Sequence, residues 1–311
     1  MVTLTVAVVA ATFLSFVMLR LSRDPVDVVG AVRGIDLSRS GARAALAREL
    51  GTDRSMVSQY ASWLWGAVHG NLGTSWVDGG RVSAKLTRAL PVNLELALLA
   101  EAVALLLALP GGLIAAARHG RPSDTVLGTF ALALVSLPGF ATAIVLVVVF
   151  STWLGWLPAT ASGYVSIFDD PVANMRSLVL PALSLGLGLG GIYTRVLRVD
   201  LGATLREDFV TFARSKGLKQ RQVLVRHTLR PSSSTLVTVV GLQLGTLIGG
   251  SLFVEVLFAF PRGLGQELTR AAIAGDFPVL LGVVALSTGA FVACNLVADS
   301  LGRALDPRGA E

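Results

Sequence analysis

The chain has 311 residues, of which 53% are hydrophobic and only 15% are charged, and its mean hydropathy is +0.69. Soluble domains carry about a quarter charged residues, so this balance excludes an ordinary soluble domain and indicates a membrane protein. The net charge of +6 does not indicate nucleic-acid binding, because the basic residues are distributed among loops instead of forming one surface.

Six apolar runs are long enough to cross a bilayer, since a helix needs about 20 mainly apolar residues to span the hydrocarbon core. We predict an all-α polytopic fold with six transmembrane helices, at residues 2–19, 92–117, 125–150, 178–193 with a few flanking residues, 236–257 and 279–297. The first run lacks a basic leader and a small-x-small cleavage site, so a transmembrane helix over residues 1–21 is favoured over a signal peptide.

Residues 22–91 form a long loop that we predict to be a small helical lobe outside the cell, followed by a membrane core over residues 92–311. Within the lobe, a helix is expected at 40–50, with Ser38 or Asp36 as N-cap and Gly51 as its stop. A second helix, amphipathic and rich in aromatic residues, is expected at 55–68.

The short loops predict the orientation, because Lys and Arg collect on the cytoplasmic side. Basic residues are frequent after the second, fourth and sixth runs, the last group including Arg303 and Arg308, and sparse in the opposite loops, which hold Arg176, Arg262 and Arg270. We therefore expect both termini to be cytoplasmic. The arginines of the long first loop are discounted, since long loops translocate largely regardless of charge.

Glycines at four-residue spacing in the fourth and fifth runs predict closely packed helices. Residues 186–191 also match G-x-G-x-x-G, but no strand–turn–helix context surrounds them, so dinucleotide binding is rejected. Cys294 lies in the sixth run and is interpreted as a small buried hydrophobe.

The segment 208–231, DFVTFARSKGLKQRQVLVRHTLRP, is basic and predicted to be helical although apolar runs flank it on both sides. A helix is expected at 205–216, Gly217 is its expected left-handed stop, and a second amphipathic helix is expected at 219–229. Two interpretations are open: the segment rests on anionic lipid headgroups, or it docks into a groove on a cytoplasmic partner.

This segment resembles the EAA loop of bacterial ABC-transporter permeases. Thr211, Phe212 and Ala213 fall on the E-A-A positions and Gly217 on the glycine; Pro231 falls one place late and the Glu is absent. The dipeptide and oligopeptide permeases are more similar still, through Asp208-Phe209, Ala213-Arg214, Lys216-Gly217-Leu218 and residues 226–230. Further similar blocks follow in family order: GNLGTSW (70–76), residues 90–98, SLPGF (136–140), LGWLPA (154–159), FVEVLFAFPRGLGQ (253–266) and LDPR (305–308). The family usually opens with a basic stretch, which is missing here; we expect either a start upstream of Met1 or an atypical opening.

The resemblance implies a type I importer permease fold in the bacterial inner membrane and a role as one of two permease subunits. The implied partners are a second homologous permease in a heterodimer, two ATPase subunits or domains, an extracytoplasmic binding protein and a peptide substrate. ATP and Mg would bind to the ATPases, and no cofactor to this chain. The expected ATPase contact is Phe209, Phe212, Ala213, Gly217 and Leu218, with Arg214 and Lys216 at its rim.

The chain is interpreted as a non-enzyme, with no catalytic and no metal-binding residues, since it has no G-x-x-x-x-G-K-[ST] loop and no nucleophile constellation. Charged and polar residues inside the runs are candidates for the substrate path. Glu101 fits a cavity lining and a structural hydrogen bond equally well, Glu95 lies nearer the outer end, and Asn295 favours an interhelical hydrogen bond. The alternatives are an ion-coupled secondary transporter, or an ABC permease for nickel chelates or haem.

Overall fold

The computed structural model describes residues 2–22 and 24–305, and within these ranges every named element is a helix. The only extended pairing among them is an isolated antiparallel bridge between Thr74 and Arg81. The all-α prediction is therefore confirmed. Residues 306–308 of the LDPR block, including Arg308, and the expectation about a start upstream of Met1 lie outside the described residues.

The chain folds into two compact units. The first comprises the residues up to Asn93 with Ile248–Val256 and Phe260–Ala290, and the second comprises Leu94–Leu247, Leu257–Ala259 and the residues from Phe291 onward. The parts predicted from the sequence, a first helix, a lobe at 22–91 and a core from residue 92, are defined by the side of the membrane on which they lie. That division stays a prediction.

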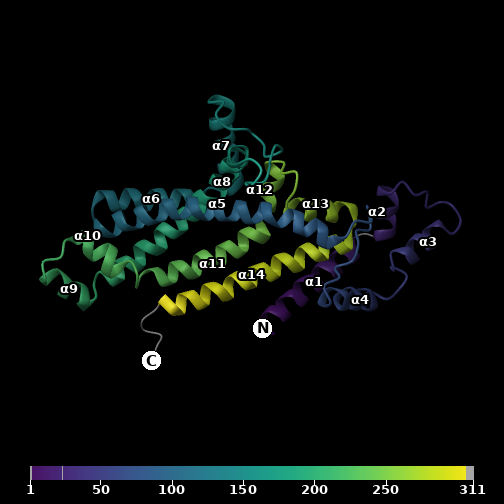
Figure 1. Ribbon diagram of the computed structural model, residues 1–311, viewed down its shortest axis with the longest axis horizontal. Coiled ribbons are helices and arrows are strands. Elements are labelled where there is room, and N and C mark those ends of the chain that lie inside the picture. The colour runs from purple at the N-terminus through teal and green to yellow at the C-terminus, as the bar shows by residue number, and fades with distance from the viewer. Residues whose placement is uncertain (1, 23, 306–311) are drawn as a thin grey trace. The chain divides into compact units, whose positions relative to one another are not determined.

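The helices are labelled in chain order (Figure 1). The first unit holds α1 (Val2–Ser22), α2 (Pro25–Val32), α3 (Ala42–Glu49), α4 (Met56–Val68), most of α12 (Leu252–Leu257) and α13 (Leu264–Ala274). The second holds α6 (Pro122–Ser136), α7 (Gly139–Leu146), the π-helix η1 (Val147–Trp153), α8 (Pro171–Thr204), α9 (Asp208–Ser215), α10 (Gln220–Gln222) and the π-helix η2 (Val223–Thr228). Three long helices contribute residues to both units: α5 (Val82–Ala117), α11 (Ser233–Gly250) and α14 (Phe277–Leu305).

In the part of the chain that the structure describes, five helices are long and apolar enough to cross a membrane, namely α1, α5, α8, α11 and α14, and the bent pair of α6 with α7–η1 makes a sixth if it counts as one span. This agrees with the six predicted spans. The third run is not one straight helix, because its two parts meet at 99°. Pro138 explains the break: it has no N–H, and its ring disfavours helical geometry at Leu137, which is extended at ψ 121.

The fifth run, 236–257, is not one helix, because it is divided at Ser251 into α11 and α12. The helices that contain the second, fourth and sixth runs are longer than the predicted spans, because polar residues next to each apolar stretch continue the same helix.

The lobe helices α3 and α4 fall within the predicted ranges, and Ser55 caps α4 by accepting a hydrogen bond from the N–H of Ser58. The predicted cap of α3 is wrong. Its N-cap is Gly41 at φ +83, whereas Asp36 accepts hydrogen bonds from the N–H and hydroxyl of Ser38 in a local turn. The sequence interpretation missed α2, although Asp24 followed by Pro25 is a strong helix-start signal.

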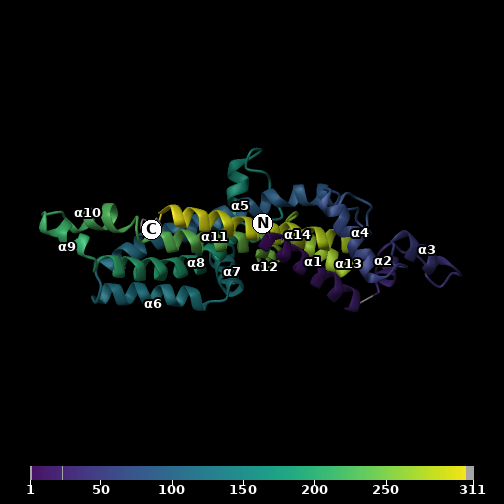
Figure 2. The same ribbon diagram turned by 90° about the horizontal axis from the view of Figure 1, so that it is seen from below.

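Glycines allow close helix packing in the second unit, as their spacing predicts. Gly186 and Gly190 of α8, four residues apart, both face α5, where a Cβ would lie 2.6 Å from the carbonyl oxygen of Ala100 and 3.1 Å from the side chain of Leu107, respectively. The helices α6 and α8 lie side by side (Figure 2). Arg198 joins them by donating to both carboxylate oxygens of Asp124, at 2.6 and 3.0 Å.

Candidate functional site

The basic segment after α8 folds as two short helices around a glycine turn. The first is α9, with Asp208 in its first turn and Arg214 in its last, which matches the charges favoured at helix ends. Gly217 at φ +78 ends it, as predicted, because a residue with a Cβ is strained in that conformation. The helix begins at 208 and not at 205, since Glu207 is extended and serves as the N-cap.

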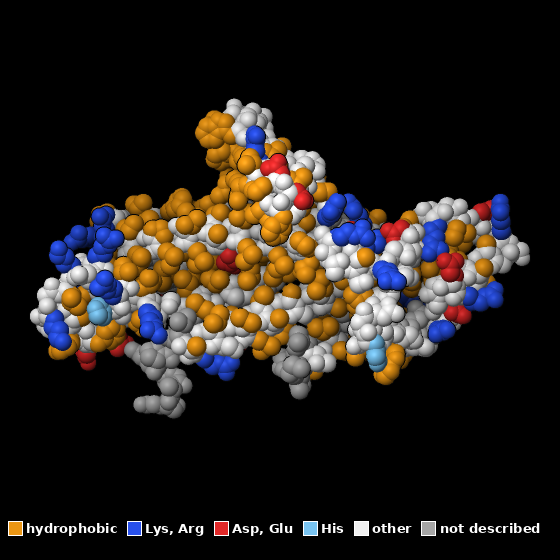
Figure 3. Space-filling view, viewed as in Figure 1, with side chains coloured by type: hydrophobic (Ala, Val, Ile, Leu, Met, Phe, Trp, Pro, Cys, Tyr) orange, Lys and Arg blue, Asp and Glu red, His pale blue; other side chains and the backbone are white. Residues whose placement is uncertain are grey.

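The second half of the segment differs from the α-helix expected at 219–229. A single turn, α10, continues as the π-helix η2. Leu229 closes this stretch by donating its backbone N–H to the carbonyl of Leu224. Both halves lie beyond the ends of α6 and α8, where Lys and Arg side chains gather on the surface (Figure 3).

The helix α9 has two apolar faces. Val210 and Ala213 are buried against Val223 of η2. Phe209 and Phe212 point away from this core and are 42% and 62% exposed. Because soluble surfaces seldom expose two neighbouring phenylalanines on one short helix, this face is a candidate contact surface.

The predicted contact residues therefore divide into two groups. Phe209, Phe212, Arg214, Lys216 and Gly217 are exposed, whereas Ala213 is 7% exposed and Leu218 packs against the core of the segment. The Lys216 ammonium lies 4.4 Å from the centroid of the Phe212 ring, which places a positive charge beside the exposed aromatic face. The role of these residues in docking stays a prediction.

The segment is attached to three long helices. Gln220 Nε2 donates to the carbonyl oxygen of Ala117 at the end of α5, at 3.0 Å. Ser232 Oγ donates to Thr204 Oγ1 at 2.8 Å, which joins the start of α11 to the end of α8. Leu205 and Leu229 also pack against the buried cluster of this unit. The segment is thus held to α5, α8 and α11 by residues that flank α9, and α9 itself is held to the segment by its contact with η2.

The three candidates for the substrate path lie in different surroundings. Glu101 is 5% exposed, and both its carboxylate oxygens accept hydrogen bonds from the hydroxyl of Tyr193, at 3.0 and 2.9 Å. Glu95 Oε2 accepts from Tyr164 at 2.9 Å and from Asn174 at 2.7 Å. Asn295 is partly exposed on α14. Within the chain, Glu101 is a structural hydrogen-bond acceptor; that any of the three lines the path stays a prediction.

The sequence interpretation considered Glu95 and Glu101 but missed Glu255, a carboxylate that lies in the predicted fifth run. This side chain is fully buried in the first unit. Its Oε1 accepts from Asn93 Nδ2 and from Ser251 Oγ, both at 2.6 Å, and its Oε2 accepts from the N–H groups of Gly265 and Gln266 at 2.8 and 3.2 Å. We call these residues the Glu255 network.

The Glu255 network fixes the start of α13. Asn93 completes it by accepting from the N–H of Leu264 at 2.8 Å, so three backbone donors at this helix terminus are satisfied by side chains. A Cβ on Gly263 would overlap the Glu255 carboxylate, which explains the glycine there. The signal in the sequence was a carboxylate in an apolar run followed by Pro-Arg-Gly-Leu-Gly.

Comparison with known proteins identifies the family. The family of binding-protein-dependent transport system inner membrane components matches residues 108–310. The chain belongs to this family. It is therefore a multi-pass membrane permease of an ABC transport system, and neither a soluble protein nor an ATPase.

Relatives and solved structures agree. The permease is 39% identical, over 84% of its length and 82% of the relative, to a Brucella abortus (strain 2308) protein whose name assigns it to a peptide transport system as permease. It is 31% identical, over 96% of its length and 94% of the relative, to the dipeptide transport system permease protein DppB of Escherichia coli K12. A chain of the inward-facing MetNI methionine ABC transporter shares its fold, with a TM-score of 0.58, 17% identity and coverage of 72% of this chain and 97% of that chain. The predicted type I importer permease fold is confirmed.

Proposed function

We propose that the permease is one of two membrane subunits of an importer for short peptides, and that α9 is its contact with a cytoplasmic ATPase. The observation that carries the ATPase contact is the exposed pair Phe209 and Phe212 on α9, whose opposite face packs against Val223 of η2, within a segment that is hydrogen-bonded to the long helices. Relatives named for peptide and dipeptide transport, at 39% and 31% identity, support the substrate class.

In this proposal, ATP and Mg bind to two ATPase subunits, and this chain binds no cofactor. The second membrane subunit is a homologous permease, and an extracytoplasmic binding protein delivers the peptide. Movement of the ATPases displaces α9 as a rigid body. Gln220 and Ser232 pass that displacement to α5, α8 and α11, whose rearrangement alternates access to the path.

Uptake by the reconstituted complex tests this function. Proteoliposomes that contain both permeases and the ATPases are expected to accumulate a labelled dipeptide only when ATP is inside and the binding protein is outside. Uptake driven by an ion gradient without ATP would instead identify a secondary transporter. Accumulation of a nickel chelate or haem, with no peptide accumulation, would contradict the substrate class.

The orientation of α9 is testable by labelling with a membrane-impermeant maleimide. In a Cys294→Ala background, Arg214→Cys is expected to react in inside-out vesicles and to be protected in right-side-out vesicles. Arg48→Cys, an exposed position on α3, should show the reverse pattern, because we place the lobe outside. Reaction of Arg214→Cys from the outer side would place α9 beyond the reach of an ATPase.

A further inference from the structure

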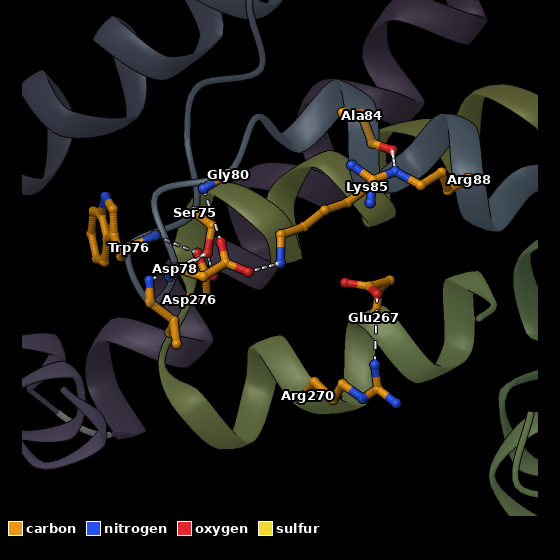
Figure 4. A network of polar contacts seen from close by, with 11 residues as sticks. Ser75, Trp76, Asp78, Gly80, Ala84, Lys85, Arg88, Glu267, Arg270 and Asp276 are labelled. Carbon is orange, nitrogen blue, oxygen red and sulfur yellow. Dashed lines mark hydrogen bonds and ion pairs between the residues drawn. The ribbon is translucent and has the colours of Figure 1, made fainter. Parts of the chain in front are cut away.

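The first unit has an open cavity of about 280 Å³ between the start of α5 and the region of α13. Five of the residues that line it are basic: Arg81, Lys85, Arg88, Arg262 and Arg270. Two are acidic, Asp78 and Glu267. In Figure 4, Lys85 and Arg88 extend from α5, and Glu267 and Arg270 from α13, on facing sides of this space. We call it the arginine cavity.

The two carboxylates compensate two of the five positive charges. Lys85 Nζ donates to Asp78 at 2.6 Å, and this hydrogen bond is the main reason that the pKa of Asp78 is lowered to about 2. Asp78 is therefore ionised at any physiological pH. Arg270 lies 3.9 Å from Glu267.

Three guanidinium groups remain without an acidic partner. Among residues 2–22 and 24–305, no carboxylate lies within ion-pair distance of Arg81, Arg88 or Arg262, and all three side chains are exposed. The Nε of Arg88 donates to the carbonyl of Ala84 at 3.1 Å (Figure 4), which leaves its two terminal nitrogens available. By contrast, Arg33 and Arg43 in the same unit are each paired with carboxylates.

Because α5 is longer than a membrane span, the unpaired arginines near its start lie away from the lipid. The helix has 36 residues, and about 20 of them suffice to cross the hydrocarbon core. With Ala117 at the cytoplasmic end, as the proposed function requires, about 16 residues at its start lie beyond the outer hydrocarbon boundary. At 1.5 Å per residue, Arg88 is about 14 Å and Arg81 about 24 Å past that boundary, and a headgroup layer is only about 5–8 Å thick. Soluble protein, and not lipid, is then the neighbour of the arginine cavity.

We propose that the arginine cavity receives acidic side chains of the extracytoplasmic binding protein when it docks on the permease. The inference rests on the proposed function and adds the docking position and the chemistry of the partner surface. Clustered guanidinium groups match carboxylates in bidentate geometry and attract an acidic surface over about a Debye length. The wall of the cavity formed by α13 is fixed in position, because the Glu255 network binds the first residues of that helix.

A charge reversal of the three unpaired arginines tests the proposal. The complex is reconstituted in nanodiscs, and its ATPase activity is titrated with its purified binding protein loaded with a dipeptide. For the combined variant Arg81→Glu, Arg88→Glu and Arg262→Glu, the half-maximal concentration of binding protein is expected to rise about tenfold or more, with a weaker dependence on salt. Basal ATPase activity should not change. The milder Arg→Gln triple variant is expected to shift the titration in the same direction, by less.

Arg48→Glu is the matched control, since Arg48 is exposed in the same unit but does not line the cavity. The proposal would be overturned if the half-maximal concentration of binding protein for the triple variant lay within twofold of that for the unaltered complex. So would a defect that disappears in nanodiscs of phosphatidylcholine alone, which would assign the cavity to anionic lipid. A defect limited to peptides with a free carboxylate terminus would assign it to the substrate. If the unaltered complex shows no stimulation by the binding protein, the proposed function fails instead.

Discussion

Glu255→Ala is expected to destabilise the permease by about 3–5 kcal/mol, because it removes a fully buried carboxylate that four donors share. The hydroxyl of Ser251 and the backbone N–H groups of Gly265 and Gln266 would be left without their acceptor, and the amide of Asn93 would keep only the longer hydrogen bonds to Ile248 O and Ser251 Oγ. The midpoint of thermal unfolding of the detergent-solubilised protein should fall by about 10 °C.

Two further variants separate the network from a general loss of charge. Glu255→Gln keeps the volume. Its NH₂ group would face the N–H groups of Gly265 and Gln266 in one orientation, and the Asn93 amide in the other, where the Ser251 hydroxyl can turn to accept; the loss should therefore be about half as large. Glu49→Ala removes a carboxylate that is 60% exposed and pairs with Arg33, and should cost less than about 1 kcal/mol. Equal melting temperatures for Glu255→Ala and Glu49→Ala would show that the Glu255 network does not stabilise the fold.

Phe212→Glu is expected to weaken the contact with the ATPase subunits and so to reduce both binding-protein-stimulated ATP hydrolysis and peptide uptake. The change replaces the more exposed phenylalanine of α9 with a charge and removes the cation–π contact with Lys216. Loss of an aromatic anchor at an interface typically costs about 2 kcal/mol or more of binding free energy. The affinity of the permease for the ATPase subunits should therefore fall by about 30-fold. Binding-protein-stimulated ATP hydrolysis and dipeptide uptake of the reconstituted complex measure the effect.

Thr211→Glu is the control for this variant, because it adds the same charge at the preceding position of the same helix and restores the residue that the family pattern has there. It should retain coupling. Since Phe212 projects away from the buried core of the segment, both variants should insert and accumulate normally. Full coupling in Phe212→Glu would remove α9 from the ATPase contact.

The sequence by itself determined the membrane class, the approximate spans and the family. Long apolar runs must be helical in lipid, where backbone groups need internal partners, so the spans are local properties of the chain. The stop at Gly217 and the cap at Ser55 were predictable for the same reason, since each depends on a few neighbouring residues. The bend at Pro138 could have been read from the sequence as well.

Only the tertiary structure decided which polar groups meet. Glu101 contacts Tyr193, 92 residues away, and Glu255 contacts Asn93, 162 residues away, and no local pattern encodes those distances. Tertiary packing also decides that Val210 and Ala213 of α9 are buried while Phe209 and Phe212 are exposed. In the same way, it places Arg262 in one cavity with Arg81 and Arg88. Helix formation depends on hydrogen bonds four residues apart, whereas these arrangements depend on which helix faces pack together, and that is a property of the whole chain.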